Sequence, residues 1–265
     1  MNRMELLRID YLFSVVIPCL LAVLINKLVI ADLLDIRVLG VIFGWGFIGI
    51  TGNLLNDAID KDRNVDYTPK ELGTIAIISF IIGITLMIET FIAYPITILF
   101  ASASIFLVIG YCVKIKQYAI INKFVLVFSH IVFPYLMIAI QPAASPITLG
   151  EIWLLITFLA FSFSGQVIHE AIDKEASLKA FSQRKIQIVV QFSSILTIIF
   201  GILAIIDLSS SFNSLYLLPF IVVPLGPMYI YRKARTPGPH IKDIGIIIGN
   251  LVLVYIVVLI IAFLP

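Results

Sequence analysis

The feature that most constrains the fold of this chain is a series of long apolar stretches, separated by short segments that contain charged, Pro or Gly residues. Crossing the hydrocarbon core of a bilayer takes about 20 apolar residues in a helix. A helix also satisfies its own backbone hydrogen bonds in lipid. We therefore predict an all-α polytopic membrane protein with nine transmembrane helices, at about residues 11–30, 38–56, 73–90, 95–113, 121–141, 151–169, 186–206, 214–231 and 243–263.

The composition excludes a soluble protein. Hydrophobic residues make up 61% of the 265 residues and charged residues only 13%, against about 45–50% and about 25% in soluble domains. Nine spans leave no room for a sizeable soluble domain, so we expect residues 1–265 to form a single transmembrane domain. The net charge of +2 gives no indication of a nucleic-acid partner. Cys19 and Cys112 lie in apolar runs, where we expect small buried side chains and neither a disulfide nor a zinc site.

The basic residues predict how the chain is oriented. With the amino terminus in the cytoplasm, 16 of the 18 Lys and Arg residues fall on the cytoplasmic side, and only Lys27 and Arg37 fall outside. Cytoplasmic connections are the ones enriched in Lys and Arg. Arg3 and Arg8 precede an apolar run, but interspersed acids and the lack of a small-residue cleavage site favour a first membrane helix over a signal peptide. We expect a cytoplasmic amino terminus and an external carboxyl terminus.

An acidic motif occurs twice, in residues 51–64 and again in residues 164–177, after the second and sixth predicted spans. Aligned at an offset of 113 residues, Asn53, Asp57, Asp60 and Asn64 match Gln166, Glu170, Asp173 and Ser177. Both sets step by four, three and four residues, so each set lies on one face of a helix. A single motif of this kind is often an ordinary solvated helix end, but two copies with the same spacing favour a functional site.

Carboxylates at the end of a membrane helix need cations or water around them. Carboxylate oxygens are the ligands that Mg²⁺ prefers, and Mg²⁺ commonly bridges to substrate phosphates. Two facing acidic stripes therefore predict Mg²⁺ bound with a diphosphate. In such a site the metal neutralises the departing diphosphate and favours cleavage of the carbon–oxygen bond.

Three segments resemble the UbiA-type intramembrane prenyltransferases. N56-D-A-I-D60 is similar to the start of the family's first aspartate-rich motif, and E170-A-I-D173 to its second. The segment Y111-C-V-K-I-K116, together with Asn122, is similar to the family's Tyr, Lys and Asn pattern. The resemblance implies two related halves with their helices around a central cavity, and a cytoplasmic active face. It also implies Mg²⁺-dependent transfer of an isoprenyl chain from its diphosphate to a small or lipophilic acceptor.

The resemblance also implies roles for individual residues. Asp57 and Asp60 would bind one Mg²⁺, Glu170 and Asp173 would bind the other, and Lys116 would contact the diphosphate. These five are the candidate catalytic residues. The candidate substrate-binding residues are Asn53, Asn56, Arg63, Lys70, Tyr111, Lys114, Asn122, Gln166 and His169. The partners implied are an isoprenyl diphosphate, an unidentified acceptor and membrane lipid.

The sequence departs from the family pattern at several positions. Asn64 and Ser177 replace the third acidic residue of each motif, and T68-P-K-E-L72 stands where the family has an Arg-Pro pair. Asp62, Asp66 and Glu175 are nearby substitutes off the main helical face. The number of metals and the acceptor therefore stay open.

The three histidines carry different expectations. His169 is either a base or diphosphate ligand, or a helix-end residue satisfied by a neighbour. His130 is expected to be packed or to line a cavity, and His240 to be solvated.

Three other functions fit parts of the pattern. The same site could ionise a prenyl diphosphate without an acceptor, as a terpene cyclase or a hydrolase does. A phosphatidyltransferase fits less well because its DG-x2-AR arrangement is absent. A cation-coupled transporter would use the carboxylates as an ion site, but transporters usually place such residues near the middle of the membrane.

Overall fold

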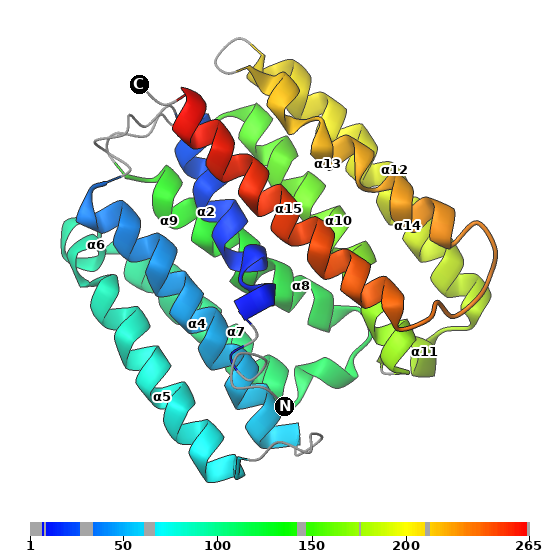
Figure 1. Cartoon of the computed structure of the whole chain (residues 1–265), viewed down its shortest axis with the longest axis horizontal. Coiled ribbons are helices and arrows are strands. Elements are labelled where there is room, and N and C mark those ends of the chain that lie inside the picture. The colour runs from blue at the N-terminus through cyan, green and yellow to red at the C-terminus, as the bar shows by residue number, and fades with distance from the viewer. Residues whose placement is uncertain are drawn as a thin grey trace. The chain divides into compact units, whose positions relative to one another are not determined.

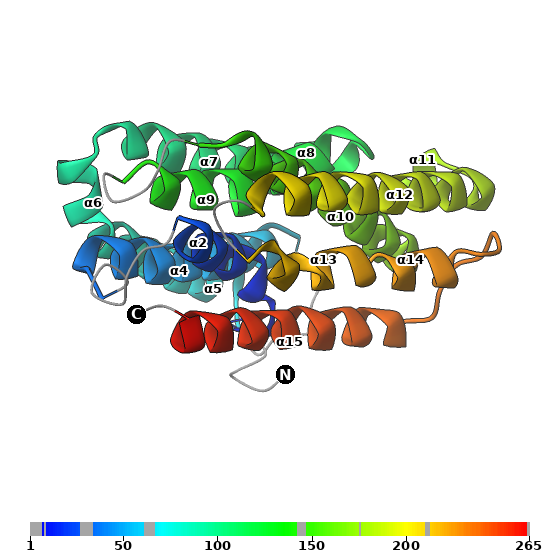
Figure 2. The same cartoon turned by 90° about the horizontal axis from the view of Figure 1, so that it is seen from above.

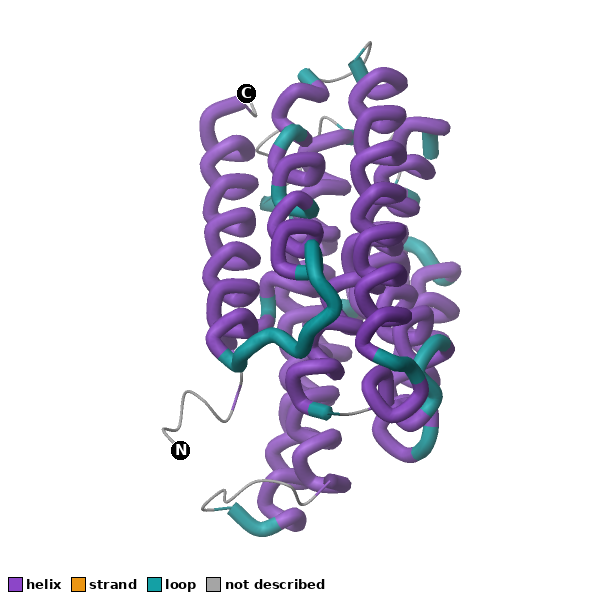
Figure 3. The backbone as a smooth tube through the Cα atoms, turned by 90° about the vertical axis from the view of Figure 1, so that its right-hand side faces the viewer, coloured by secondary structure: helices purple, strands orange, loops and turns teal. Residues whose placement is uncertain are grey.

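A computed structural model describes residues 7, 9–26, 34–60, 67–141, 147–174, 176–209 and 213–263. Within these ranges every regular element is a helix (Figure 3). The chain groups into two compact units. Unit 1 comprises residues 1–114, 128–145 and 246–265, and unit 2 comprises residues 115–127 and 146–245.

Seven helical stretches among the described residues are long and apolar enough to cross a membrane. They are α4 (Ile36–Asp60), α5 (Pro69–Leu86), α7 (Ile96–Val113), the stretch from α8 (Ile121–Val127) through η3 (Phe128–Val132) to α9 (Phe133–Ala139), α10 (Leu149–Asp173), α12 (Gln183–Leu208) and α15 (His240–Phe263). The all-helical membrane fold predicted from the apolar stretches is confirmed, and these seven match seven of the nine predicted spans.

The first and eighth predicted spans correspond to shorter helices. The first contains α2 (Phe13–Ile25), preceded by η1 (Ile9–Tyr11). The eighth is divided into η4 (Ser214–Leu217), α13 (Pro219–Val222) and α14 (Leu225–Ile230). Pro219 and Pro224 lie at these divisions, and proline interrupts a helix because it has no amide hydrogen to donate. Short helices α6 (Ile88–Ala93), η2 (Ile115–Gln117) and α11 (Ala176–Ala180) complete the described elements.

In unit 1, α4 packs closely against α5, and the two helices lie side by side in Figure 1. Glycines make this approach possible. A Cβ added at Gly44 would lie 2.9 Å from the carbonyl oxygen of Gly83, and one added at Gly40 would overlap the backbone of Leu86. Small residues let membrane helices approach at backbone distance, and Gly40 and Gly44 allow α4 to approach α5 in this way. Gly46, in contrast, faces open space.

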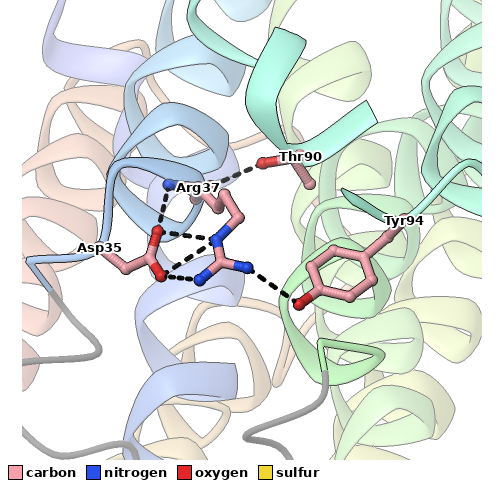
Figure 4. A network of polar contacts seen from close by, with 4 residues as sticks. All are labelled: Asp35, Arg37, Thr90 and Tyr94. Carbon is pink, nitrogen blue, oxygen red and sulfur yellow. Dashed lines mark hydrogen bonds and ion pairs between the residues drawn. The ribbon is translucent and has the colours of Figure 1, made fainter. Parts of the chain in front are cut away.

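A polar network anchors the first turn of α4 to the end of α6 (Figure 4). The Asp35 carboxylate accepts hydrogen bonds from the backbone N–H and the guanidinium of Arg37. Arg37 also donates to the Tyr94 hydroxyl, and the Thr90 hydroxyl donates to the Arg37 carbonyl at 2.8 Å. The Arg37 guanidinium holds the pKa of the Asp35 carboxyl below its usual range. Arg37, one of the two basic residues outside the predicted cytoplasmic face, is thus neutralised locally.

Also in unit 1, one turn of π-helix, η3, precedes α9. Pro134 has no amide hydrogen, so it offers no donor to the carbonyl five residues earlier, that of Ser129. The Ser104 hydroxyl of α7 donates to that carbonyl instead, at 3.0 Å. His130 lies in this turn, with its Nδ1 2.8 Å from the Ser129 hydroxyl oxygen. It lines a small cavity with Trp45, which is one of the two positions expected for it from the sequence.

Unit 2 is built around α10 and α12, with α13 and α14 along α12 (Figure 2). Its core contains Val167 and Ile168 of α10, Ile186 and Val190 of α12, and Tyr231. The helix α10 begins with a capping box, in which Thr148 and Glu151 each bind the other's backbone N–H.

Large apolar side chains stay exposed in both units, including Ile77 and Ile81 of α5 and Ile188 and Phe192 of α12. Contiguous apolar surface of this kind is stable against lipid and not against water. The two cysteines are buried and free, as predicted.

Candidate active site

The first acidic motif forms the last turns of α4, in unit 1. Asn53, Asn56, Asp57 and Asp60 follow one another at helical spacing, and the helix ends at Asp60. Asp57 is buried, with 7% of its surface exposed. The side-chain oxygen of Asn56 is buried and has no hydrogen-bond partner among the described residues.

The basic and aromatic residues predicted to contact the substrate lie at helix ends. In unit 1, Tyr111 is in the last turn of α7, Lys114 is exposed directly after it, and Lys70 is exposed in the first turn of α5. In unit 2, Lys116 lies in η2 and is half-buried. Arg63, Asn64, Asp62, Asp66 and Glu175, all named from the sequence, lie outside the described residues.

The second motif forms the last turns of α10, in unit 2. Glu170 is buried and accepts four hydrogen bonds. Its Oε1 accepts one from the side-chain amide of Asn122, at 2.6 Å. Its Oε2 accepts from Lys123 Nζ at 2.5 Å, and from the Ser177 N–H and hydroxyl at 2.9 and 2.6 Å. This carboxylate is therefore surrounded by donors.

Lys123 is the residue that sequence reasoning missed. The charge distribution predicts Lys123 in a cytoplasmic connection, but it lies in α8 with none of its surface exposed. Ile121, Phe124 and Phe128 form the exposed side of this stretch, which turns Lys123 inward. The sequence signal for this buried pairing is the position of Lys123 inside an apolar stretch, because ionisable residues inside membrane helices usually pair.

A local turn brings Ser177 back to Glu170. The helix α10 ends at Lys174, whose φ of 59° is in the left-handed region. Non-glycine residues adopt this region infrequently, and here it reverses the chain directly after Asp173. Ser177 then lies in the first turn of α11, where its N–H is available to the Glu170 carboxylate.

Asp173 is more accessible than Glu170. Its carboxylate accepts hydrogen bonds from Lys242 Nζ at 2.7 and 2.9 Å, and His169 Nε2 lies 3.2 Å from Oδ2. The helix-end alternative for His169, satisfied by a neighbour, matches this contact. The remaining motif residue, Gln166, has a buried side-chain oxygen without a hydrogen-bond partner in the described part of the chain.

The two acidic motifs are not equally suited to binding Mg²⁺. In each motif a buried amide oxygen, that of Asn56 or Gln166, lacks a donor within the described residues, and a hard cation is a suitable partner for such an oxygen. Glu170 does not fit as well, because donors already surround its oxygens. Across the described ranges, no group of three or more His, Cys, Asp and Glu side chains is gathered closely enough to hold a metal by itself. Further oxygen ligands would have to come from a substrate phosphate or water.

Comparison with known proteins identifies the fold. No protein-family model and no curated protein matches the sequence. A solved structure of a digeranylgeranylglyceryl phosphate synthase in membranes matches with a TM-score of 0.63, covering 98% of this chain and 98% of that chain at 19% identity. The chain has the fold of this synthase. This match agrees with the resemblance to UbiA-type prenyltransferases and with the all-helical membrane fold predicted from the apolar stretches.

Proposed function

We propose that this protein transfers an isoprenyl chain from its diphosphate to a lipophilic acceptor in the membrane, with Mg²⁺ as cofactor. The observation that carries the proposal is the pair of acidic motifs in the last turns of α4 and α10, in a chain with a UbiA-type fold. The buried Asn56 and Gln166 oxygens, one in each motif, support it because they provide a cation with ligands that no described donor uses.

Each acidic motif would contribute oxygen ligands to bound Mg²⁺, from Asp57 and Asp60 on α4 and from Asp173 on α10. Bound Mg²⁺ would neutralise charge on the diphosphate. The exposed Lys114 and Lys70 and the half-buried Lys116 are donors without acceptor capacity, so each is suited to bind diphosphate oxygens.

The reaction breaks the bond between C1 of the isoprenyl chain and the bridging oxygen, and the electron pair leaves with the diphosphate. The acceptor atom forms a new bond to C1 and loses its proton. The structural neighbour is a digeranylgeranylglyceryl phosphate synthase, so we expect a hydroxyl-bearing glycerol phosphate ether among the acceptors. Aromatic quinone precursors are the next class to test.

The position of the acids disfavours the transporter alternative. Asp57 and Asp60 lie in the final turns of α4, and Glu170 and Asp173 in the final turns of α10. Secondary transporters instead bind ions at interrupted helices near the membrane midplane.

To test the proposal, purified protein in lipid nanodiscs is incubated with labelled geranylgeranyl diphosphate, Mg²⁺ and a panel of acceptors. We expect diphosphate release that depends on an acceptor and on Mg²⁺. Asp57→Asn and Asp60→Asn should each lower the rate by at least about 100-fold, since removing one stabilising group for developing charge costs that much. Glu89→Gln, an exposed carboxylate on α6, is the matched control and should keep full activity.

Three outcomes contradict the proposal. Absence of diphosphate release with every acceptor, or full activity in both Asp variants, rules out the site. Terpene or alcohol products formed from the diphosphate alone would instead show the cyclase or hydrolase alternative.

A further inference from the structure

The cluster around Glu170 differs from the surroundings expected of a metal ligand. A ligating carboxylate keeps at least one oxygen lone pair directed toward the ion. Glu170 Oε2 instead accepts from Lys123 Nζ, the Ser177 N–H and the Ser177 hydroxyl, and Oε1 accepts from Asn122. Its side chain is also only 7% exposed.

These donors are held in place by the fold. Lys123 is fully buried, and its Nζ also donates to the Asn122 side-chain oxygen at 3.0 Å. The Asn122 side-chain amide in turn donates to the Lys116 carbonyl at 3.1 Å. The Ser177 N–H belongs to the backbone and cannot rotate away. A metal at Oε2 of Glu170 would therefore have to displace a backbone donor and a buried ammonium together, and a metal at Oε1 would share the carboxylate with that ammonium.

Asp173 provides the contrast within the same motif. Its ammonium partner, Lys242, has 24% of its side chain exposed, and Asp173 itself has 31%. Exposed pairs of this kind contribute little, about 0–1 kcal/mol, so Lys242 is readily displaced by a divalent ion. Asp173 is thus the more available of the two carboxylates of the second motif.

We propose that Lys123 is a built-in counter-ion of the second acidic motif. It holds Glu170 in a structural role, joining α8, the end of α10 and α11, and it leaves Asp173 as the metal ligand of that motif. Lys123 is a positioning residue that acts through Glu170. The inference rests on the proposed function, because it states which carboxylates of that site bind the cation.

Binding of Mn²⁺ in the presence of inorganic diphosphate tests this without catalysis. Free Mn²⁺ is measured by electron paramagnetic resonance for the wild type, the Asp57→Asn variant and the double variant Lys123→Met/Glu170→Gln, which replaces the ion pair by neutral side chains of similar size. We expect the double variant to bind Mn²⁺ within about twofold of the wild type. Asp57→Asn should bind at least about tenfold more weakly, because even outer-shell changes cost that much. Glu89→Gln is the unchanged control.

The single variant Lys123→Met gives a second readout, which a role in folding alone would not change. Lys123→Met leaves the Glu170 charge without its ammonium, so we expect this variant to bind Mn²⁺ more tightly than the wild type. The added Glu170→Gln substitution should remove that gain, and Lys123→Arg should behave as the wild type. Because the double variant removes both charges of the Lys123–Glu170 pair, it tests the inference even where Lys123→Met does not fold.

The outcomes separate this inference from the proposed function. A double variant that binds Mn²⁺ at least tenfold more weakly shows that Glu170 is a ligand and overturns the inference while leaving the prenyltransferase proposal in place. Equal Mn²⁺ binding by the wild type and Asp57→Asn overturns the metal site itself, and the inference with it.

Discussion

Replacing Lys123 by Met should strongly destabilise the protein. The substitution removes the cation whose Nζ lies 2.5 Å from Glu170 Oε2, and it leaves a carboxylate that is 7% exposed. Breaking a buried ion pair by removing one partner costs about 3–5 kcal/mol. Asn122 and Ser177 still donate three hydrogen bonds to the carboxylate, so we expect the lower end of this range, about 3 kcal/mol.

The second substitution, Glu170→Gln, should restore most of this stability in the Lys123→Met background. The introduced glutamine side chain would carry no charge and would keep an oxygen for the Ser177 donors. We expect the double variant to lie within about 1 kcal/mol of the wild type. Glu170→Gln alone leaves the Lys123 ammonium without this carboxylate and should also cost about 3 kcal/mol. The double variant should then cost far less than the two single variants together, which gives a coupling energy of several kcal/mol, at or above the top of the range of about 0.5–3 kcal/mol measured for contacting residues.

Reversible unfolding by SDS in mixed micelles, followed by circular dichroism, measures these free energies. Expression level and retention time on size exclusion confirm that each variant starts folded. A coupling energy near zero would refute the reasoning, since it would mean that the ammonium and the carboxylate do not depend on each other in the folded protein.

Three further predictions concern the fold. Gly40→Ala should lower the free energy of unfolding by about 1–3 kcal/mol because the new Cβ meets the backbone of Leu86. Gly46→Ala is the control, because its new Cβ meets no atom within 4 Å. An equal loss of stability in both variants would contradict the close packing at Gly40. Thr148→Ala should cost about 1 kcal/mol, because it removes the capping box that begins α10, and unchanged SDS unfolding would show that the cap does not contribute. The pKa of Asp35 is lowered in the folded protein. Its contribution to stability is therefore present above the unfolded carboxyl pKa of about 3.9 and is lost as the pH falls through the lower folded value. Asp35→Asn should remove this dependence, and the same change of unfolding free energy with pH in both proteins would contradict the prediction.

The parts of the fold that the sequence predicts are those set by local composition. The spans at 38–56 and 186–206 match α4 and α12 because about 20 apolar residues in succession have few alternatives in a membrane. The sequence predicts one helix for the eighth span because the span stays apolar despite its prolines, which interrupt the hydrogen bonds of the helix. The pairing of Lys123 with Glu170 joins residues 47 positions apart, and no pattern along one helix indicates such a contact. Position in the motif suggested a ligand for Glu170, while its chemical surroundings come from α8 and the turn after α10.

The π-helical turn η3 before α9 links the residue types that evolution can accept at two positions of this chain. Pro134 removes a donor from the Ser129 carbonyl, and the Ser104 hydroxyl supplies one from another helix. In lipid an unsatisfied carbonyl costs several kcal/mol, so proline at position 134 without a donor at position 104 would be harmful, whereas a hydroxyl at position 104 alone would not. The two positions are thus expected to vary together among relatives, with a hydroxyl at position 104 wherever proline is found at position 134.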